Sequence, residues 1–149
     1  KKVKFGITCP IANNTRVITI VSFLLIAGIE YAMIHCGQFS YRAFNIHIGA
    51  MFGTMMAFNV WFRIWPAQQR IIRAIKEGNA PDAADVGLAG LRSKHNTYMS
   101  VPLLWTMINQ HTVVFSGKGF VGLTLLVVIA LGWHIVFQLY KKSGKIQGF

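Results

Sequence analysis

Four long apolar blocks constrain the fold of this chain more than any other feature. They cover residues 17–34, 44–65, 97–115 and 120–140. A helix rises about 1.5 Å per residue, so the roughly 30 Å hydrocarbon core of a bilayer takes about 17 to 25 residues, and each block has that length. We therefore predict an all-α integral membrane protein, a four-helix bundle whose membrane domain covers residues 17–141.

The basic residues predict the orientation of this bundle. The formal net charge is +11, and the charges lie between the apolar blocks, which argues against a nucleic-acid-binding surface. Thirteen of the fifteen Lys and Arg residues fall on one side of a four-span topology, in an N-terminal arm (1–16), a loop (66–96) and a tail (142–149) together with the adjoining helix ends. Only Arg42 and Lys118 fall on the other side. The positive-inside rule places both termini in the cytoplasm.

The loop over 66–96 is the one substantial hydrophilic stretch, since the outer connections are too short for a soluble catalytic domain. Its first part is predicted to continue the second span as a helix that stops at Gly78 and Pro81. After Asp82 a short amphipathic piece is predicted, and the loop is expected to lie on the cytoplasmic headgroups.

Small residues and cysteines add two further predictions. Gly49, Gly53 and Ala57 form a groove that suits helix packing, the favoured use, or a flat cofactor. Cys9 and Cys36 fall on opposite faces and cannot pair, and the chain has no CxxCH site for a c-type haem.

Ionisable residues within the apolar blocks are costly and therefore candidate functional groups. His47 and His111 both fall about 5 Å inside the outer boundary, whereas His134 falls in the inner half near His95. Two histidines from different helices can hold a b-type haem through its two axial positions. We predict one or two b haems, with His47 and His111 as the favoured pair and His95 with His134 as the second. The alternative is that these histidines hydrogen-bond between helices.

The segments around these histidines bear on the haem prediction in opposite ways. Four residues, Thr54, Phe58, Trp61 and Trp65, continue the helix face of His47 as a mainly aromatic stripe that suits a porphyrin edge or helix packing. His95 and His111 are sixteen residues apart, a rotation of about 160° on one helix, so a straight helix would not aim both at the same core.

Other chemistries are indicated less well. Glu30 is either a proton-handling carboxylate or, as we favour, an ion-pair partner of Arg42 or His35. A zinc or copper site would have to use His35, His47 and His111, which lack the HxxxH spacing of a helical metal site. No glycine-rich phosphate loop and no Ser-His-Asp arrangement is present, so hydrolysis is not indicated.

Several motifs resemble a known family. They comprise the run from Arg92 to Tyr98 (RSKHNTY) with Pro102-Leu103-Leu104, Met107 and His111, and before it His47, Asn59-Val60-Trp61-Phe62, Pro66, Gln68, Gly78, Pro81 and Asp82. Over about residues 44–141 the chain resembles the membrane domain at the N-terminus of bacterial membrane-bound urate oxidases, which end in a cytochrome c domain. The resemblance implies a membrane redox protein that passes electrons towards c-type cytochrome.

The chain departs from that family in having about half the spans and no cytochrome c domain. We therefore expect an electron-transfer subunit that carries haem b, with other membrane subunits, a c-type cytochrome, lipid and quinone as partners, and not a complete enzyme. The alternatives are a haem-free accessory subunit that stabilises a larger complex, and a part of a membrane urate oxidase.

Overall fold

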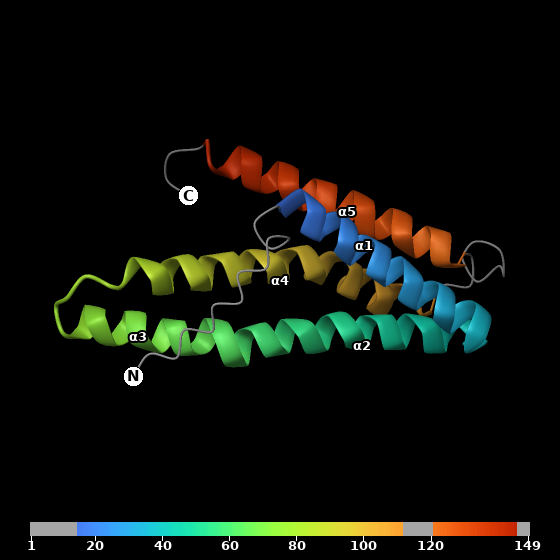
Figure 1. Ribbon diagram of the computed structural model, residues 1–149, viewed down its shortest axis with the longest axis horizontal. Coiled ribbons are helices and arrows are strands. Elements are labelled where there is room, and N and C mark those ends of the chain that lie inside the picture. Colours follow the sequence, from blue (N-terminus) through green and yellow to red (C-terminus); the bar gives the residue numbers. More distant parts are fainter. Residues whose placement is uncertain (1–14, 112–120, 146–149) are drawn as a thin grey trace.

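The computed structural model describes residues 15–111 and 121–145, and all of the regular structure in these ranges is helical (Figure 1). The elements are α1 (Thr15–Tyr31) with a π-helical turn η2 (Ala32–Cys36), α2 (Tyr41–Asn59), a π-helical turn η3 (Val60–Ile64), α3 (Trp65–Lys76), α4 (Ala83–Asn109) and α5 (Val121–Ser143). The all-α prediction is confirmed. Most of the basic N-terminal arm with Cys9, the segment with Lys118 and the end of the tail lie outside the described residues.

The segments α2, η3 and α3 follow one another as a single rod that lies antiparallel to α4 (Figure 1). They contain 19, 5 and 12 residues, which makes the rod about 54 Å long. The rod is therefore longer than the roughly 30 Å core of a bilayer. Its α3 end and the first turns of α4 form a helical hairpin, and the loop predicted over 66–96 is largely helix.

Local sequence signals explain where the hairpin turns. Gly78 has a positive φ of 72°, a conformation that glycine adopts without strain, directly after α3 ends. Asp82 caps α4 by accepting a hydrogen bond from the Ala84 N–H at 2.9 Å. The predicted stop and restart are confirmed. The prediction of a short separate piece after Asp82 is wrong, because α4 continues through Pro102 to Asn109 without a break.

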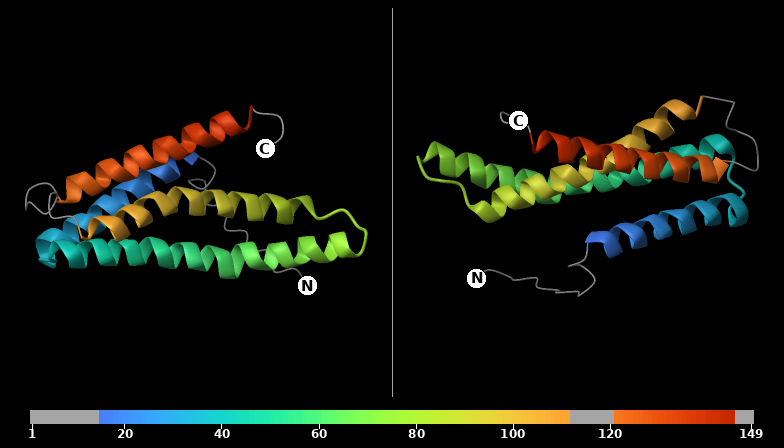
Figure 2. Two further views of the ribbon diagram at one scale, coloured as in Figure 1. Left: turned by 180° about the vertical axis from the view of Figure 1, so that it is seen from behind. Right: turned by 90° about the horizontal axis from the view of Figure 1, so that it is seen from above.

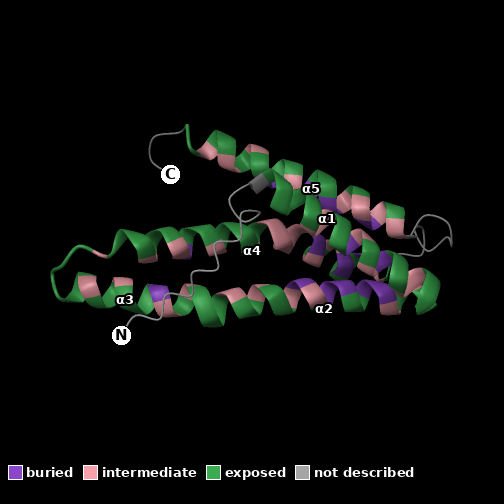
Figure 3. Cartoon of the chain, in the orientation of Figure 1, coloured by how far each residue is buried: buried purple, intermediate pink, exposed green. Residues whose placement is uncertain are grey.

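The apolar core lies at the end of the molecule where α1, α2, α4 and α5 come together (Figures 1 and 3). Its buried members are Ile26 of α1, Phe44, Ile48 and Phe52 of α2, and Leu125 and Ile129 of α5. Seen from above, α1 lies at the edge of the molecule, beside the other helices (Figure 2).

Two helical stretches among the described residues are long and apolar enough to cross a membrane, Arg16–Cys36 and Gly122–Ser143. Only 11% and 22% of their apolar windows are buried, so most of this surface faces outward. These stretches correspond to the first and fourth predicted spans, and a topology with four spans stays a prediction.

Candidate functional site

The α2–α4 contact holds most of the polar side chains of the helix interior. Where α2 begins and α4 ends, the Tyr41 hydroxyl donates to the Asn109 carbonyl oxygen at 3.2 Å, and the Asn109 side-chain amide donates to the same hydroxyl. The Asn45 amide donates to the Tyr41 carbonyl at 2.9 Å, and both Asn45 and Asn109 are buried. This cluster fixes the start of α2 against the end of α4.

A second polar contact lies further along the same helix pair. The Asn59 amide donates to the Asn96 side-chain oxygen at 3.0 Å, and the Asn96 amide donates to the Met56 carbonyl at 3.2 Å. Asn96 belongs to the RSKHNTY run, so the most distinctive motif of the sequence fixes the register of α4 on α2.

Between these two contacts the helices approach closely. A Cβ added to Gly49 would lie 2.7 Å from Thr106 Oγ1, so only glycine fits there. The favoured interpretation of the small-residue groove, helix packing, is confirmed at this position. An open groove of about 340 Å³ remains beside it, lined by Asn45, Ile46, Gly49, Ala50, Gly53, Leu103, Thr106, Met107 and Gln110.

Aromatic and basic residues gather at one level near the base of the hairpin. Trp61 is 72% exposed, next to Arg63 in η3. On the other side of α4, the Lys94 ammonium lies 4.5 Å from the centre of the Tyr140 ring, and Tyr98 stacks on that ring at 6.3 Å. Amphipathic rings together with cations are typical of a membrane–water boundary.

His47 is exposed on α2 and makes a hydrogen bond within its own helix. Its Nδ1 donates to the Ala43 carbonyl at 2.7 Å, so Nε2 is the nitrogen that the neutral ring would use to accept a hydrogen bond or to ligate. Its ring meets Phe39 edge-on at 5.0 Å. The aromatic stripe on the same face, Thr54, Phe58, Trp61 and Trp65, is also exposed. No other helix of the described chain covers this stripe, and its use as a porphyrin edge or a packing face stays a prediction.

The other four histidines are exposed as well. His111 lies in the turn after α4, His134 Nε2 lies 3.2 Å from the Gln138 amide nitrogen, and His35 stacks on Tyr31 at 4.4 Å. Partial burial, and to a smaller extent the positive charge of Arg92, lower the pKa of His95 below its ordinary value. None of these contacts joins two histidines. Within the described residues, no three His, Cys, Asp or Glu side chains are placed to hold a metal ion, so the His35, His47 and His111 metal cluster is not formed.

Glu30 is the one buried acidic residue of the described chain, with 2% of its surface exposed. Neither of its carboxyl oxygens has a hydrogen-bond partner among the described residues. Arg42 is exposed and His35 contacts Tyr31, so the favoured ion pair of Glu30 with Arg42 or His35 is wrong.

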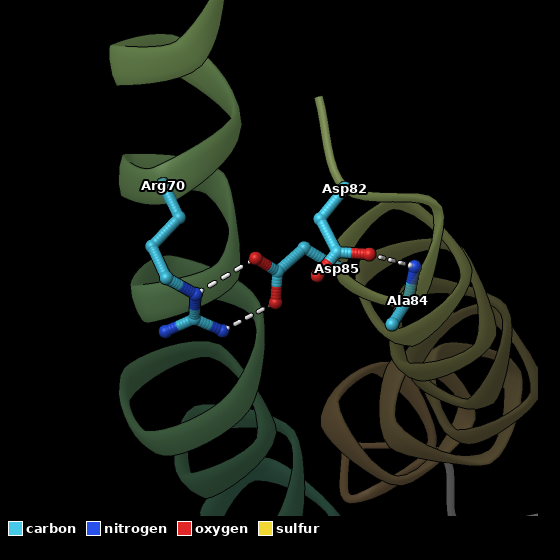
Figure 4. Close-up of polar contacts among 4 residues, drawn as sticks. All are labelled: Arg70, Asp82, Ala84 and Asp85. Atoms are coloured by element: carbon cyan, nitrogen blue, oxygen red, sulfur yellow. Dashed lines mark hydrogen bonds and ion pairs between the residues drawn. The ribbon is translucent and has the colours of Figure 1, made fainter. Parts of the chain in front are cut away.

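The hairpin is held by an exposed ion pair (Figure 4). The Arg70 guanidinium donates from Nε and from Nη2 to the two carboxyl oxygens of Asp85, at 2.8 and 2.5 Å. This bidentate contact raises the pKa of Arg70 and holds the pKa of Asp85 below its ordinary value.

Comparison with known protein families gives one match that covers nearly the whole chain. The family described as urate oxidase N-terminal matches residues 4–147. The chain belongs to the urate oxidase N-terminal family. Neither the curated proteins nor the solved structures contain a match.

In this member of the urate oxidase N-terminal family, sequence reasoning missed the amides that join the helices. Asn45, Asn59, Asn96 and Asn109 are all in or beside apolar blocks, and that position is itself a signal, because an amide in lipid needs a partner. Histidines were the predicted site residues because they can ligate metals. In the structure, asparagine and tyrosine side chains make the interhelical hydrogen bonds.

Proposed function

We propose that this chain is a membrane-embedded helical module of a urate oxidase-related redox system in the bacterial inner membrane, with four spans and cytoplasmic termini. The family match over residues 4–147 carries the proposal. It is supported by the outward-facing apolar surfaces of α1 and α5, because exposing so large an apolar area to water is unfavourable.

The aromatic and basic level near Trp61, Arg63 and Tyr140 supports a membrane boundary at the cytoplasmic side. With the boundary there, the twelve residues of α3 extend about 18 Å beyond it. The α3–α4 hairpin then stands out from the membrane, unlike the expectation that this loop lies flat on the headgroups. A projecting hairpin is accessible to other subunits of an assembly.

Thiol accessibility tests this topology. Cys36 would face the periplasm and Ala80, in the hairpin turn, the cytoplasm. In spheroplasts of a Cys9→Ser variant, a membrane-impermeant maleimide should label Cys36. In a variant with Cys9→Ser, Cys36→Ser and Ala80→Cys it should label the protein only after lysis. Labelling of Ala80→Cys from outside, or recovery of the chain in the soluble fraction, would contradict the proposal.

The proposed role is electron transfer towards a c-type cytochrome, together with other membrane subunits. Membranes that contain the chain and its native partners should show urate-dependent reduction of added cytochrome c, and membranes from a deletion strain should not. If reduction persists after deletion, or is absent from the intact assembly, the urate part of the proposal fails while the membrane topology stands.

Haem b is a second part of the proposal, and His47 is the residue that suits it best. The Nδ1–H bond to the Ala43 carbonyl orients the ring and leaves Nε2 free, as is common for histidines that ligate metals. A haem would supply one-electron transfer at this position. Because His47 faces outward, a second protein ligand would come from a partner subunit or from His111, with His95 and His134 as the less suitable candidates.

Pyridine haemochrome spectra of the purified assembly test the haem proposal. A b-type band should be lost in His47→Ala and kept in His35→Ala, the matched control in η2, whose ring stacks on Tyr31. If fully assembled protein has no b-type band, the chain is better described as a haem-free accessory subunit.

A further inference from the structure

Glu30 differs from the other acidic residues of the chain. Glu77, Asp82 and Asp85 lie in the α3–α4 hairpin, whereas Glu30 lies in α1, inside the first apolar block. It is 2% exposed, and both carboxyl oxygens are buried without a hydrogen-bond partner among the described residues. The membrane topology of the proposed function gives no role to this group.

The start of α5 lies close to Glu30. A Cβ added to Gly122 at the start of α5 would lie 3.6 Å from Glu30 Oε2 and 3.0 Å from Ile34 Cδ1. The glycine therefore lets the start of α5 approach the carboxyl closely. The buried residue Ile26 lies one turn earlier on α1 and belongs to the apolar core.

Titratable groups on the surrounding elements have other contacts. His35 of η2 stacks on Tyr31, Tyr41 of α2 is bonded to Asn109, and His134 of α5 lies against Gln138. Arg42 and His47 at the start of α2 are exposed. No described cation is therefore in place to neutralise an ionised Glu30.

Burial without a partner is far more costly for an ionised carboxylate than for a neutral acid. We propose that Glu30 is a proton-binding site, which holds one proton while α1 and α5 are in contact and exchanges it when the contact opens at Gly122. The proposal rests on the membrane placement of the proposed function, but on neither urate nor haem.

A hydrophobic carbodiimide tests this directly, because it reaches protonated carboxyls in apolar surroundings. The acid O–H adds across one C=N bond, the proton goes to nitrogen, and the O-acylisourea rearranges to a stable N-acylurea without loss of atoms. In native membranes containing the full chain at neutral pH, mass spectrometry should find this adduct on Glu30. A water-soluble carbodiimide with an added amine should instead modify Glu77, which is exposed.

Three variants sharpen the test. Glu30→Gln keeps the shape of the side chain and should lose the adduct completely. Gly122→Ala places a methyl group against Ile34 and Glu30, and should increase modification of Glu30 by the water-soluble reagent. Gly28→Ala on α1 is the matched control, since nothing lies within 4 Å of its Cβ position, and it should leave both reactions unchanged.

Two results would overturn the proposal even with the expected thiol topology. One is the absence of any adduct on Glu30 in folded wild-type protein, which means that the carboxyl is ionised or paired. The other is equal reaction of Glu30 and Glu77 with the water-soluble reagent, which means that Glu30 is open to water. An unexpected thiol topology contradicts the membrane placement first, so the two failures can be told apart.

Discussion

The α2–α4 pair and the α1–α5 pair are held together in different ways. Polar contacts join α2–η3–α3 to α4 at three levels, through Tyr41 and Asn109, Asn59 and Asn96, and Arg70 and Asp85. By contrast, α1 meets α5 through apolar contacts such as the edge-on pair Phe23 and Trp133 at 6.2 Å. The first pair specifies its own register, whereas the second exposes most of its apolar surface and depends on lipid or a partner to cover it.

The largest loss of stability is expected from Gly49→Ala, which changes the α2–α4 contact. The added methyl group would lie 2.7 Å from Thr106 Oγ1 and 3.5 Å from its Cβ, so α2 and α4 would have to move apart. Overpacking of this kind lowers the free energy of unfolding by about 1–3 kcal/mol. Reversible unfolding in detergent micelles, followed by tryptophan fluorescence, measures the loss.

Two further variants show whether this loss comes from the α2–α4 contact. Gly28→Ala on α1 adds the same methyl group where nothing lies within 4 Å, and it should not lower the free energy of unfolding. Adding Thr106→Ala to Gly49→Ala removes the clashing hydroxyl and should restore part of the loss. A cost for Gly28→Ala equal to that for Gly49→Ala would contradict the difference between the two helix pairs.

The sequence predicts the helices well, because their lengths and ends depend on local features. The lengths of the apolar blocks predicted the helices. Gly78 and Asp82 correctly predicted where the hairpin turns. The continuation of α4 across the predicted boundary at residue 97 was not predicted. Hydropathy changes there from polar to apolar while the backbone continues as helix, so composition alone placed a break where none exists.

The candidate site is predicted less well, because depth in a span says nothing about the direction of a side chain. His47 has the predicted position on α2 but faces outward, whereas Phe44, Ile48 and Phe52 face the core. Glu30 is buried as expected, yet its predicted ion pair does not form. The direction of the His47 side chain and the partner of Glu30 both depend on how a helix is rotated relative to its neighbours, and tertiary packing determines this rotation.

A smaller effect is expected from Asn96→Ala. The change leaves the Asn59 amide and the Met56 carbonyl without their α4 partner. The free energy of unfolding should fall by about 1 kcal/mol, measured in the same detergent assay. Ser100→Ala is the matched control on α4, because the Ser100 hydroxyl bonds only to Thr97 within its own helix. If the two variants cost the same, the Asn59–Asn96 contact does not fix the register of the helices.

The smallest effect is expected at the hairpin, where the contact between Arg70 and Asp85 is exposed. Arg70 holds the pKa of Asp85 below its ordinary value of 3.8, so the folded hairpin binds a proton less readily than the unfolded chain. The contribution of the pair is fully present above about pH 3.8 and is lost as the pH falls through the lowered pKa of folded Asp85. Hydrogen exchange of α3 amides between neutral and acid pH measures this contribution.

Arg70→Gln should remove this acid-induced loss of protection, because the unpaired Asp85 would titrate alike in the folded and unfolded chain. Exposed ion pairs are weakened by salt, so high ionic strength should mimic the variant. The polar contacts at Asn59, Asn96 and Asn109 carry no charge and should not respond to salt or to this pH range. A salt-dependent loss of exchange protection confined to α3 and the first turns of α4 would therefore distinguish the projecting hairpin from the remainder of the α2–α4 pair. A uniform loss of protection would show instead that the hairpin and the pair unfold as one unit.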